Sequence, residues 1–295
     1  MLTILLGVLV EGFVYAIMAL GVYITYKILD FPDLSVDGTF PLGGAITAVL
    51  IAGGVNPLLT LFISFIIGGF AGMITGIIHV KFKIRDLLSG IIIMTALYSI
   101  NLRIAGKANL AIFSKDSIFD NALLTKIIPT GLQPFLDAII LFIIVVIMKL
   151  LLDLYLNTKS GYLLRSVGDN DTLVTSLAKD KGTVKIIGLA IANAFVALAG
   201  SIFVQKSGFF DISMGTGTIV IGLASVIIGT NLFKQFSAVK ATTAVIIGSV
   251  IYKACVSIAI SLGMAASDLK LITSILFLII LILGYDRKRK VKANA

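Results

Sequence analysis

The chain has 295 residues, of which 58% are hydrophobic and 13% charged, and its formal net charge is +9. Soluble domains carry about a quarter charged residues, so this composition excludes a water-soluble surface and indicates that lipid covers much of the exterior. The basic residues lie in short runs between apolar stretches, a pattern typical of membrane topology rather than of nucleic-acid binding. We therefore predict an all-α, polytopic transmembrane bundle of about eight to ten spans.

Apolar stretches that could cross a bilayer follow one another along the chain, since a helical span needs about 20 mostly apolar residues. They lie at residues 3–26, 38–54, 57–79, 87–105, 135–156, 185–204, 214–230, 238–262 and 268–284. No basic region precedes the first stretch, so we interpret it as a retained span rather than a signal peptide. The spans form one membrane domain with approximate halves 1–134 and 135–284, followed by a basic tail at 285–295.

The lysines and arginines between the spans predict the direction of the chain. Sixteen of the 24 fall on one side and six on the other, with Lys149 and Lys253 inside spans. The richer side is taken as the cytoplasm, which places the N-terminus outside and the basic C-terminus inside. Residues 106–134 then lie outside, where we expect a small surface helix, and residues 157–184 lie inside.

Two of the stretches, 38–54 and 214–230, are short and interrupted by glycine, which predicts broken or partly re-entrant helices. The sequence before the first, DLSVDGT from residue 33, resembles DISMGTGT from residue 211. Five spans separate the two copies, so the copies would run in opposite directions, as in an inverted repeat whose broken helices line a transport route. Chance similarity between helix caps is the alternative.

Polar residues of these two segments are candidates for the translocation path, because a helix broken inside the bilayer must face protein or water. The aspartates and serines can cap the helix that follows them or contact the substrate, and both roles remain open. The candidates are Asp33, Ser35, Asp37, Gly38, Gly43, Gly44, Asp211, Ser213, Gly215, Gly217 and Gly222.

The loop 157–184 contains two short amphipathic segments that cannot span a membrane. The first begins at Ser160-Gly161 and places Leu163, Leu164 and Val167 on one side. The second is expected near 171–180, after an acidic turn that suits a helix N-terminus. Both helices would lie along the cytoplasmic face, docking either on a partner or under their own bundle.

The residues of this loop resemble the coupling loop of bacterial ATP-binding-cassette importer permeases, in the branch of the branched-chain amino acid and ribose permeases. The stretches FPDLSVDGTFPLGGA (31–45) and IGLASVIIG (221–229) are similar to a narrower group linked to tryptophan and tyrosine. After the loop, Lys181-Gly182 stands where the family typically has a hydrophobic Gly-Ile, a departure at the edge of the docking surface. The coupling positions that match are Gly161, Leu164, Arg165, Val167, Gly168, Asp169 and Asn170.

The resemblance implies an importer for a small polar solute, such as an amino acid, in a bacterial cell membrane. Its partners would be cytoplasmic ATPase subunits, an extracytoplasmic substrate-binding lipoprotein, and a second permease as homodimer or heterodimer. The chain has no phosphate-binding loop of the Gly-x-x-x-x-Gly-Lys-Ser/Thr type. We therefore expect no enzyme activity and no cofactor in this chain, with ATP and Mg²⁺ bound by the partner ATPase.

Two other classes of protein compete with this hypothesis. An ion-coupled secondary transporter is also built on inverted repeats, but such proteins often carry ionisable residues inside spans. Here the few candidates are Glu11, Lys149, Lys253 and the aspartates at helix starts. An intramembrane enzyme would need a nucleophile with a base, or metal ligands. The sequence offers a single histidine, His79, and a single cysteine, Cys255, and predicts no metal site.

Overall fold

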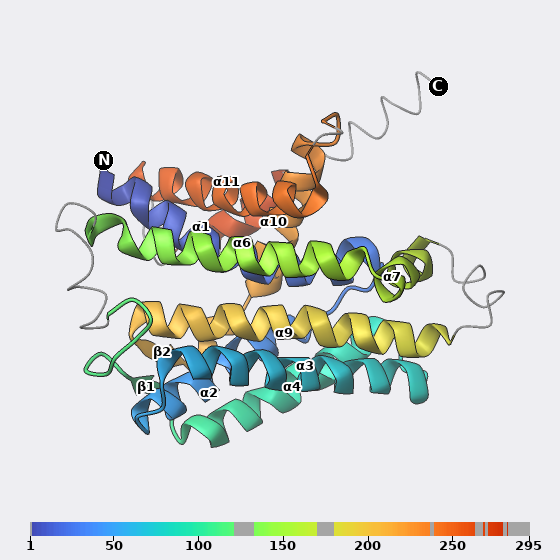
Figure 1. The fold of residues 1–295 in the computed structure, drawn as a ribbon, viewed down its shortest axis with the longest axis horizontal. Coiled ribbons are helices and arrows are strands. Elements are labelled where there is room, and N and C mark those ends of the chain that lie inside the picture. Colours follow the sequence, from blue (N-terminus) through green and yellow to red (C-terminus); the bar gives the residue numbers. More distant parts are fainter. Residues whose placement is uncertain are drawn as a thin grey trace.

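The computed structural model describes residues 2–120, 133–169, 180–236, 239–262, 268, 271–279 and 282. Long helices lie side by side along one axis (Figure 1). Among the described residues, seven helical segments are long and apolar enough to cross a membrane: Leu2–Ile28, Pro57–Lys81, Asp86–Ala105, Gln133–Leu156, Lys181–Ser207, Ile212–Leu232 and Ala241–Ser261. The predicted all-α transmembrane bundle is confirmed.

The elements follow the predicted spans closely. Residues 271–279 of the last predicted span are helical, and the basic tail lies outside the described residues. In chain order the elements are α1 (Leu2–Val22), the π-helix η1 (Tyr23–Ile28), α2 (Val36–Ala52), α3 (Pro57–Lys81), α4 (Asp86–Ala105), β1 (Asn109–Ala111), η2 (Gln133–Phe135), α6 (Leu136–Leu156), α7 (Lys159–Asp169), α9 (Lys181–Ser207), β2 (Phe209–Asp211), η3 (Ile212–Gly215), α10 (Thr218–Leu232) and α11 (Ala241–Ser261).

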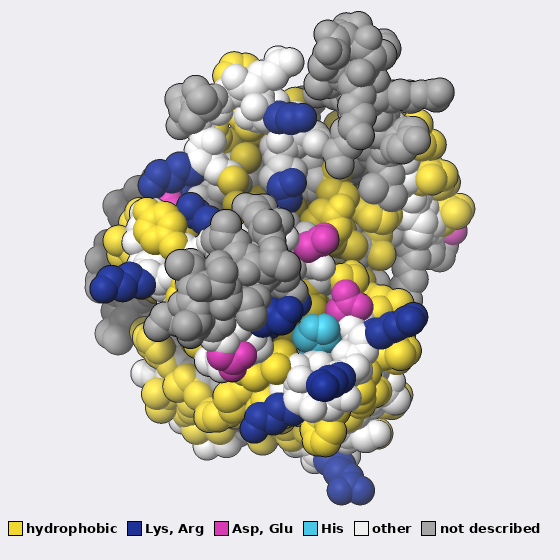
Figure 2. Space-filling view, turned by 90° about the vertical axis from the view of Figure 1, so that its right-hand side faces the viewer, with side chains coloured by type: hydrophobic (Ala, Val, Ile, Leu, Met, Phe, Trp, Pro, Cys, Tyr) yellow, Lys and Arg dark blue, Asp and Glu magenta, His cyan; other side chains and the backbone are white. Residues whose placement is uncertain are grey.

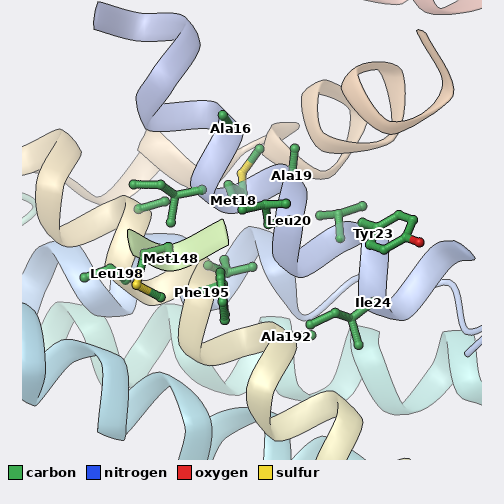
Figure 3. Packing of buried hydrophobic residues seen from close by; sticks show 14 of the residues in the cluster. Ala16, Met18, Ala19, Leu20, Tyr23, Ile24, Met148, Ala192, Phe195 and Leu198 are labelled. Carbon is green, nitrogen blue, oxygen red and sulfur yellow. The ribbon is translucent and has the colours of Figure 1, made fainter. Parts of the chain in front are cut away.

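Helix α9 is the centre of the bundle and contacts α1, α2 and α3. Its neighbour α3 presents Gly68, Gly72 and Gly76 at four-residue intervals, and a Cβ at Gly72 would overlap the carbonyl oxygen of Leu189 in α9. Small residues at this spacing let two membrane helices approach closely. Phe195 of α9 and its neighbours also pack with α1 and α6 in the apolar core (Figure 3).

The two short helices begin near the same level and run in opposite directions. At the start of α2, the Ser35 hydroxyl donates to Asn193 near the middle of α9. Helix α2 then runs to the C-terminal end of α9, where Gln205 donates to the carbonyl of Pro57. Helix α10 begins beside α2 and runs the other way, toward Lys240. Each is a continuous helix that starts inside the bundle after a non-helical stretch, residues 29–35 before α2 and residues 216–217 before α10, and the two helices run in the opposed directions expected of an inverted repeat.

The two ends of the bundle differ. At one end, the ribbon end, β1 pairs antiparallel with β2, with Asn109 opposite Asp211. This ribbon follows α4 and α9 and was not predicted from the sequence. Residues 106–120 form the strand and turns, and residues 121–132, where the expected surface helix could lie, are outside the described part, so that helix stays a prediction.

The opposite end carries α7, and we refer to it as the α7 end. It is also where α3 ends and where α4, α9 and α11 begin (Figure 1). Lysine and arginine side chains are scattered over this end of the molecule, with His79 among them (Figure 2). The positive charge of the loops predicted to be inside therefore gathers at one end, and the assignment of that end to the cytoplasm stays a prediction.

Candidate functional site

The predicted coupling loop contains the helix α7, which has one face on the bundle and one face outward. The hydroxyl of Thr158 accepts a hydrogen bond from the Gly161 amide at 3.2 Å, which caps the first turn. Leu164 and Val167 are buried, whereas Tyr162 is 57% exposed and Arg165 is also exposed. The pattern of apolar residues separated by three positions is that of an amphipathic surface helix.

Two glycines fix how closely α7 lies on the bundle. A Cβ at Gly161 would overlap the carbonyl of Tyr155 at the end of α6, and a Cβ at Gly168 would overlap the carbonyl of Ile28 at the end of η1. The side chain of Leu164 lies against Gly188 of α9. Four of the predicted coupling residues thus pack α7 under its own bundle, one of the two roles that the sequence left open.

The remaining coupling residues lie elsewhere on the segment. Arg165 points away from the apolar contacts and lines a cavity of about 210 Å³ together with Tyr23 and Lys240. Asp169 is the last residue of α7. Asn170 and the second helix expected near 171–180 lie outside the described residues. Among the described residues of α7, those exposed and open to a partner are Lys159, Tyr162 and Arg165, and Arg165 also borders this cavity.

A buried carboxylate beside α7 was missed in the sequence. Asp153 accepts hydrogen bonds from the hydroxyl of Thr242 at 2.7 Å, from Lys149 at 3.0 Å and from Lys240 at 3.4 Å. It joins the end of α6 to the start of α11. The four-residue spacing of Lys149 and Asp153 in an apolar span is the signal that could have revealed an internal ion pair.

The two copies of the repeat form the same local turn. The Asp33 carboxylate accepts from the Ser35 amide at 2.9 Å, and the Asp211 carboxylate accepts from the Ser213 amide at 2.8 Å. Asp33 is buried and also accepts from the side chain of Asn193 at 2.8 Å. Hydrogen bonds from the Ser213 hydroxyl and amide hold the pKa of Asp211 below its usual range. This shared geometry supports the alignment of the two copies.

Asp37 caps a different helix from the one expected. Its sequence position predicted a cap on α2, but its carboxylate accepts from the amide of Ile219 at 2.8 Å, the amide of Gly217 at 2.9 Å and the hydroxyl of Thr218 at 3.0 Å. All three donors belong to the start of α10. The fold brings the Asp37 carboxylate next to the start of α10. The first amides of a helix have no partner within the helix and carry partial positive charge, so they attract a nearby carboxylate.

The predicted glycines serve close packing and one turn. A Cβ at Gly43 would overlap the carbonyl of Ala197, and a Cβ at Gly215 would overlap the carbonyl of Asp37. Gly217 precedes α10 with φ of +83°, a conformation that favours glycine. At the other glycines of this set, an added Cβ would come within 4 Å of neighbouring residues. These neighbours are Met94 and Leu97 at Gly38, Val204 and Met214 at Gly44, and Val22 at Gly222.

A cavity of about 390 Å³ lies beside the junction of the broken helices. Only Asp37 and Gly38 of the predicted path residues line it. Of the other lining residues, Met94, Thr95, Tyr98 and Asn101 come from α4, and Pro41, Ile212 and Thr216 come from the two short segments. On the other side of the junction, Ser213 and Gly217 line a second cavity of about 460 Å³ that also borders Lys253.

The remaining ionisable residues inside the spans form pairs. Lys253 lies 2.9 Å from Glu11 and 4.1 Å from the ring centroid of Tyr15, so α1 and α11 are joined by an ion pair and a cation–π contact. Among the described residues, no group of three or more His, Cys, Asp or Glu side chains is arranged to hold a metal ion.

Comparison with known proteins decides the family. Residues 4–284 match the model of the permease component of branched-chain amino acid transport systems. The chain belongs to this family. As a permease component of an ATP-binding-cassette type of transport system, it is a multi-pass membrane protein.

Individual relatives cover most of the permease. A tyrosine transport system permease protein of Clostridioides difficile is 46% identical over 99% of this chain and 95% of its own length. An uncharacterized protein of Rickettsia prowazekii is 32% identical over 94% and 96% of the two chains. The ribose import permease of Haemophilus influenzae is 25% identical over 76% and 68%. No solved structure matches the chain significantly.

Proposed function

We propose that this permease forms the translocation path of an ATP-driven importer for an amino acid. The similarity to a tyrosine transport permease along almost the whole chain supports this substrate class. The solute would be delivered by an extracytoplasmic binding lipoprotein at the ribbon end, and a second permease, as homodimer or heterodimer, would complete the path.

The observation that carries the proposal is the two-sided helix α7. Its inner face is locked to the bundle by Gly161, Leu164 and Gly168, and its outer face presents Tyr162 and Arg165. Tyrosine and arginine are enriched among the residues that contribute most binding energy at protein interfaces, so the exposed Tyr162 and Arg165 suit contact with a partner. We assign the outer face to a cytoplasmic ATPase that binds ATP and Mg²⁺, with the N-terminus of the permease outside and the C-terminus inside.

Movement of α7 would reach the path through rigid contacts. Gly168 touches the backbone of Ile28 at the end of η1, and Leu164 touches Gly188 of α9. Helix α9 holds the start of α2 through Asn193. Because packed helices move as units rather than deform continuously, a pull on α7 displaces the helices that carry both broken segments.

Under this proposal the residues have two roles. The coupling role belongs to Gly161, Leu164, Arg165, Val167, Gly168, Asp169 and Asn170. The broken helices of the path carry Asp33, Ser35, Asp37, Gly38, Gly43, Gly44, Asp211, Ser213, Gly215, Gly217 and Gly222. Within the second set, Asp33, Asp37 and Asp211 hold turns and helix starts.

The proposal is tested with the permease and its ATPase reconstituted in proteoliposomes, with uptake and ATP hydrolysis measured together. Arg165→Glu should lower uptake more than about tenfold, as expected for a charge reversed at an interface, while Arg85→Glu, an exposed charge at the same end but outside α7, should not. Equal uptake by both variants would contradict the coupling role. Uptake without any ATPase would favour an ion-coupled secondary transporter.

A further inference from the structure

One buried polar atom in the bundle has no partner. Asn101 of α4 is 1% exposed. Its amide nitrogen donates to the carbonyl of Gly38 at 3.0 Å, but its Oδ1 atom accepts no hydrogen bond from any residue in the described ranges. Buried polar atoms are nearly always hydrogen-bonded, because a lost bond to water is otherwise not replaced.

The orientation of the Asn101 amide follows from its neighbour. A backbone carbonyl only accepts, so the group facing Gly38 must be the nitrogen, and the oxygen is turned away from it. Asn101 lines the cavity of about 390 Å³ at the junction of the broken helices. The Asn101 oxygen is thus an acceptor on a residue of the cavity wall that no described residue satisfies.

The other lining groups favour a cation over an anion. Hydroxyl groups come from Thr95, Tyr98 and Thr216, a carboxylate comes from Asp37, and no lysine or arginine is among the described residues that line the cavity. The Asp37 carboxylate already accepts three hydrogen bonds, and a carboxylate has about four acceptor positions. One acceptor position of Asp37 is thus left, and Asp37 lines the same cavity as Asn101.

The size and position of the cavity suit a small molecule in transit. Its volume of about 390 Å³ falls within the usual range of ligand sites, roughly 300–1,000 Å³. Tyr98 is 55% exposed and offers an aromatic ring, which attracts ammonium groups electrostatically. Gly38, whose carbonyl orients Asn101, stands in the first turns of the broken helix α2.

We propose that this cavity binds the ammonium group of the transported solute, with Oδ1 of Asn101 and the carboxylate of Asp37 as acceptors. The inference rests on the importer function proposed above and adds to it a recognition site within the permease itself. Selection would then act twice, once at the binding protein and once here, and the second step would require a protonated amine.

The test measures binding to the complex of permease and ATPase in lipid nanodiscs, without the binding protein, by saturation-transfer NMR. The probes are L-tyrosine, tyramine, which keeps the amine and lacks the carboxylate, hydroxyphenylpropionate, which lacks the amine, and D-ribose. We expect binding of the two amines only. Binding of hydroxyphenylpropionate or ribose as strong as that of tyramine, or no binding of any probe, would overturn the inference.

Variants locate the site. Asn101→Leu should weaken tyramine binding about tenfold, since hydrogen bonds to charged groups are of this strength, whereas Asn231→Leu, at the far end of α10, should not. Thr95 is exposed, so Thr95→Lys and Thr95→Gln test the site even if Asn101→Leu fails to fold. The lysine should exclude tyramine and the glutamine should not; unchanged binding in Thr95→Lys would overturn the inference.

The outcome is separable from that of the importer function. ATP-dependent uptake of L-tyrosine by the wild-type transporter tests the function, and the selectivity of the permease for amines tests the cavity. A transporter that imports L-tyrosine while Asn101→Leu binds tyramine as the wild type does would refute the cavity and leave the function standing.

Discussion

Replacement of Asp37 by asparagine should destabilise the contact between the two broken helices. The Oδ2 atom accepts from the amide of Gly217, and in the variant an NH₂ group can stand there, so that two donors face each other. Losing a hydrogen bond to a charged group costs about 1.5–3 kcal/mol. Removing a negative charge from a partly buried helix start costs up to about 2 kcal/mol more. The total loss is roughly 1.5–5 kcal/mol.

The single cysteine allows this loss to be measured directly. Cys255 is half-buried, so a thiol-reactive dye reports its exposure as the purified permease is heated. A loss of this size should lower the apparent melting temperature by roughly 5–15 °C. Asp137→Asn is the matched control, because Asp137 pairs with Lys206 at the surface, where ion pairs contribute little. A decrease no larger than that of the control would refute the capping role of Asp37.

Two further predictions concern stability by the same assay. Gly43→Ala should lower the melting temperature by several degrees, because its Cβ would overlap the carbonyl of Ala197 and overpacking costs about 1–3 kcal/mol. Gly7→Ala, where nothing lies within 4 Å, should be neutral or stabilising, and similar effects at both sites would contradict the packing. Asp180→Ala removes the cap of α9, in which the Asp180 carboxylate accepts hydrogen bonds from the Gly182 and Thr183 amides. The free energy of unfolding should fall by about 1 kcal/mol. Asp180→Asn should retain most of the stabilisation that the cap provides.

The spans and their breaks could be predicted because hydrophobicity and glycine content are properties of each segment alone. The predicted span 57–79 became Pro57–Lys81, and 87–105 became Asp86–Ala105. The similar turns at Asp33 and Asp211 were also visible, since an aspartate that binds the amide two residues later is a local motif.

The contacts between distant segments could not be predicted from the sequence. Nothing near Asp37 shows that its carboxylate caps a helix more than 170 residues away along the chain. Pairing of β1 with β2 joins the ends of α4 and α9, and its strands are too short to give a pattern. Asn101 is one polar residue in an apolar span, and only the position of Gly38 reveals its unpaired oxygen.

The central claim is that α7 is held from the cytoplasm by an ATPase, and cysteine accessibility tests it most directly. In a Cys255→Ser background, Tyr162→Cys labels the outer face of α7 and Phe113→Cys, 72% exposed, labels the ribbon end. With a membrane-impermeant maleimide, Tyr162→Cys should react only in inside-out vesicles and should be protected by bound ATPase, whereas Phe113→Cys should react in intact cells. Labelling of Tyr162→Cys in intact cells would contradict the account.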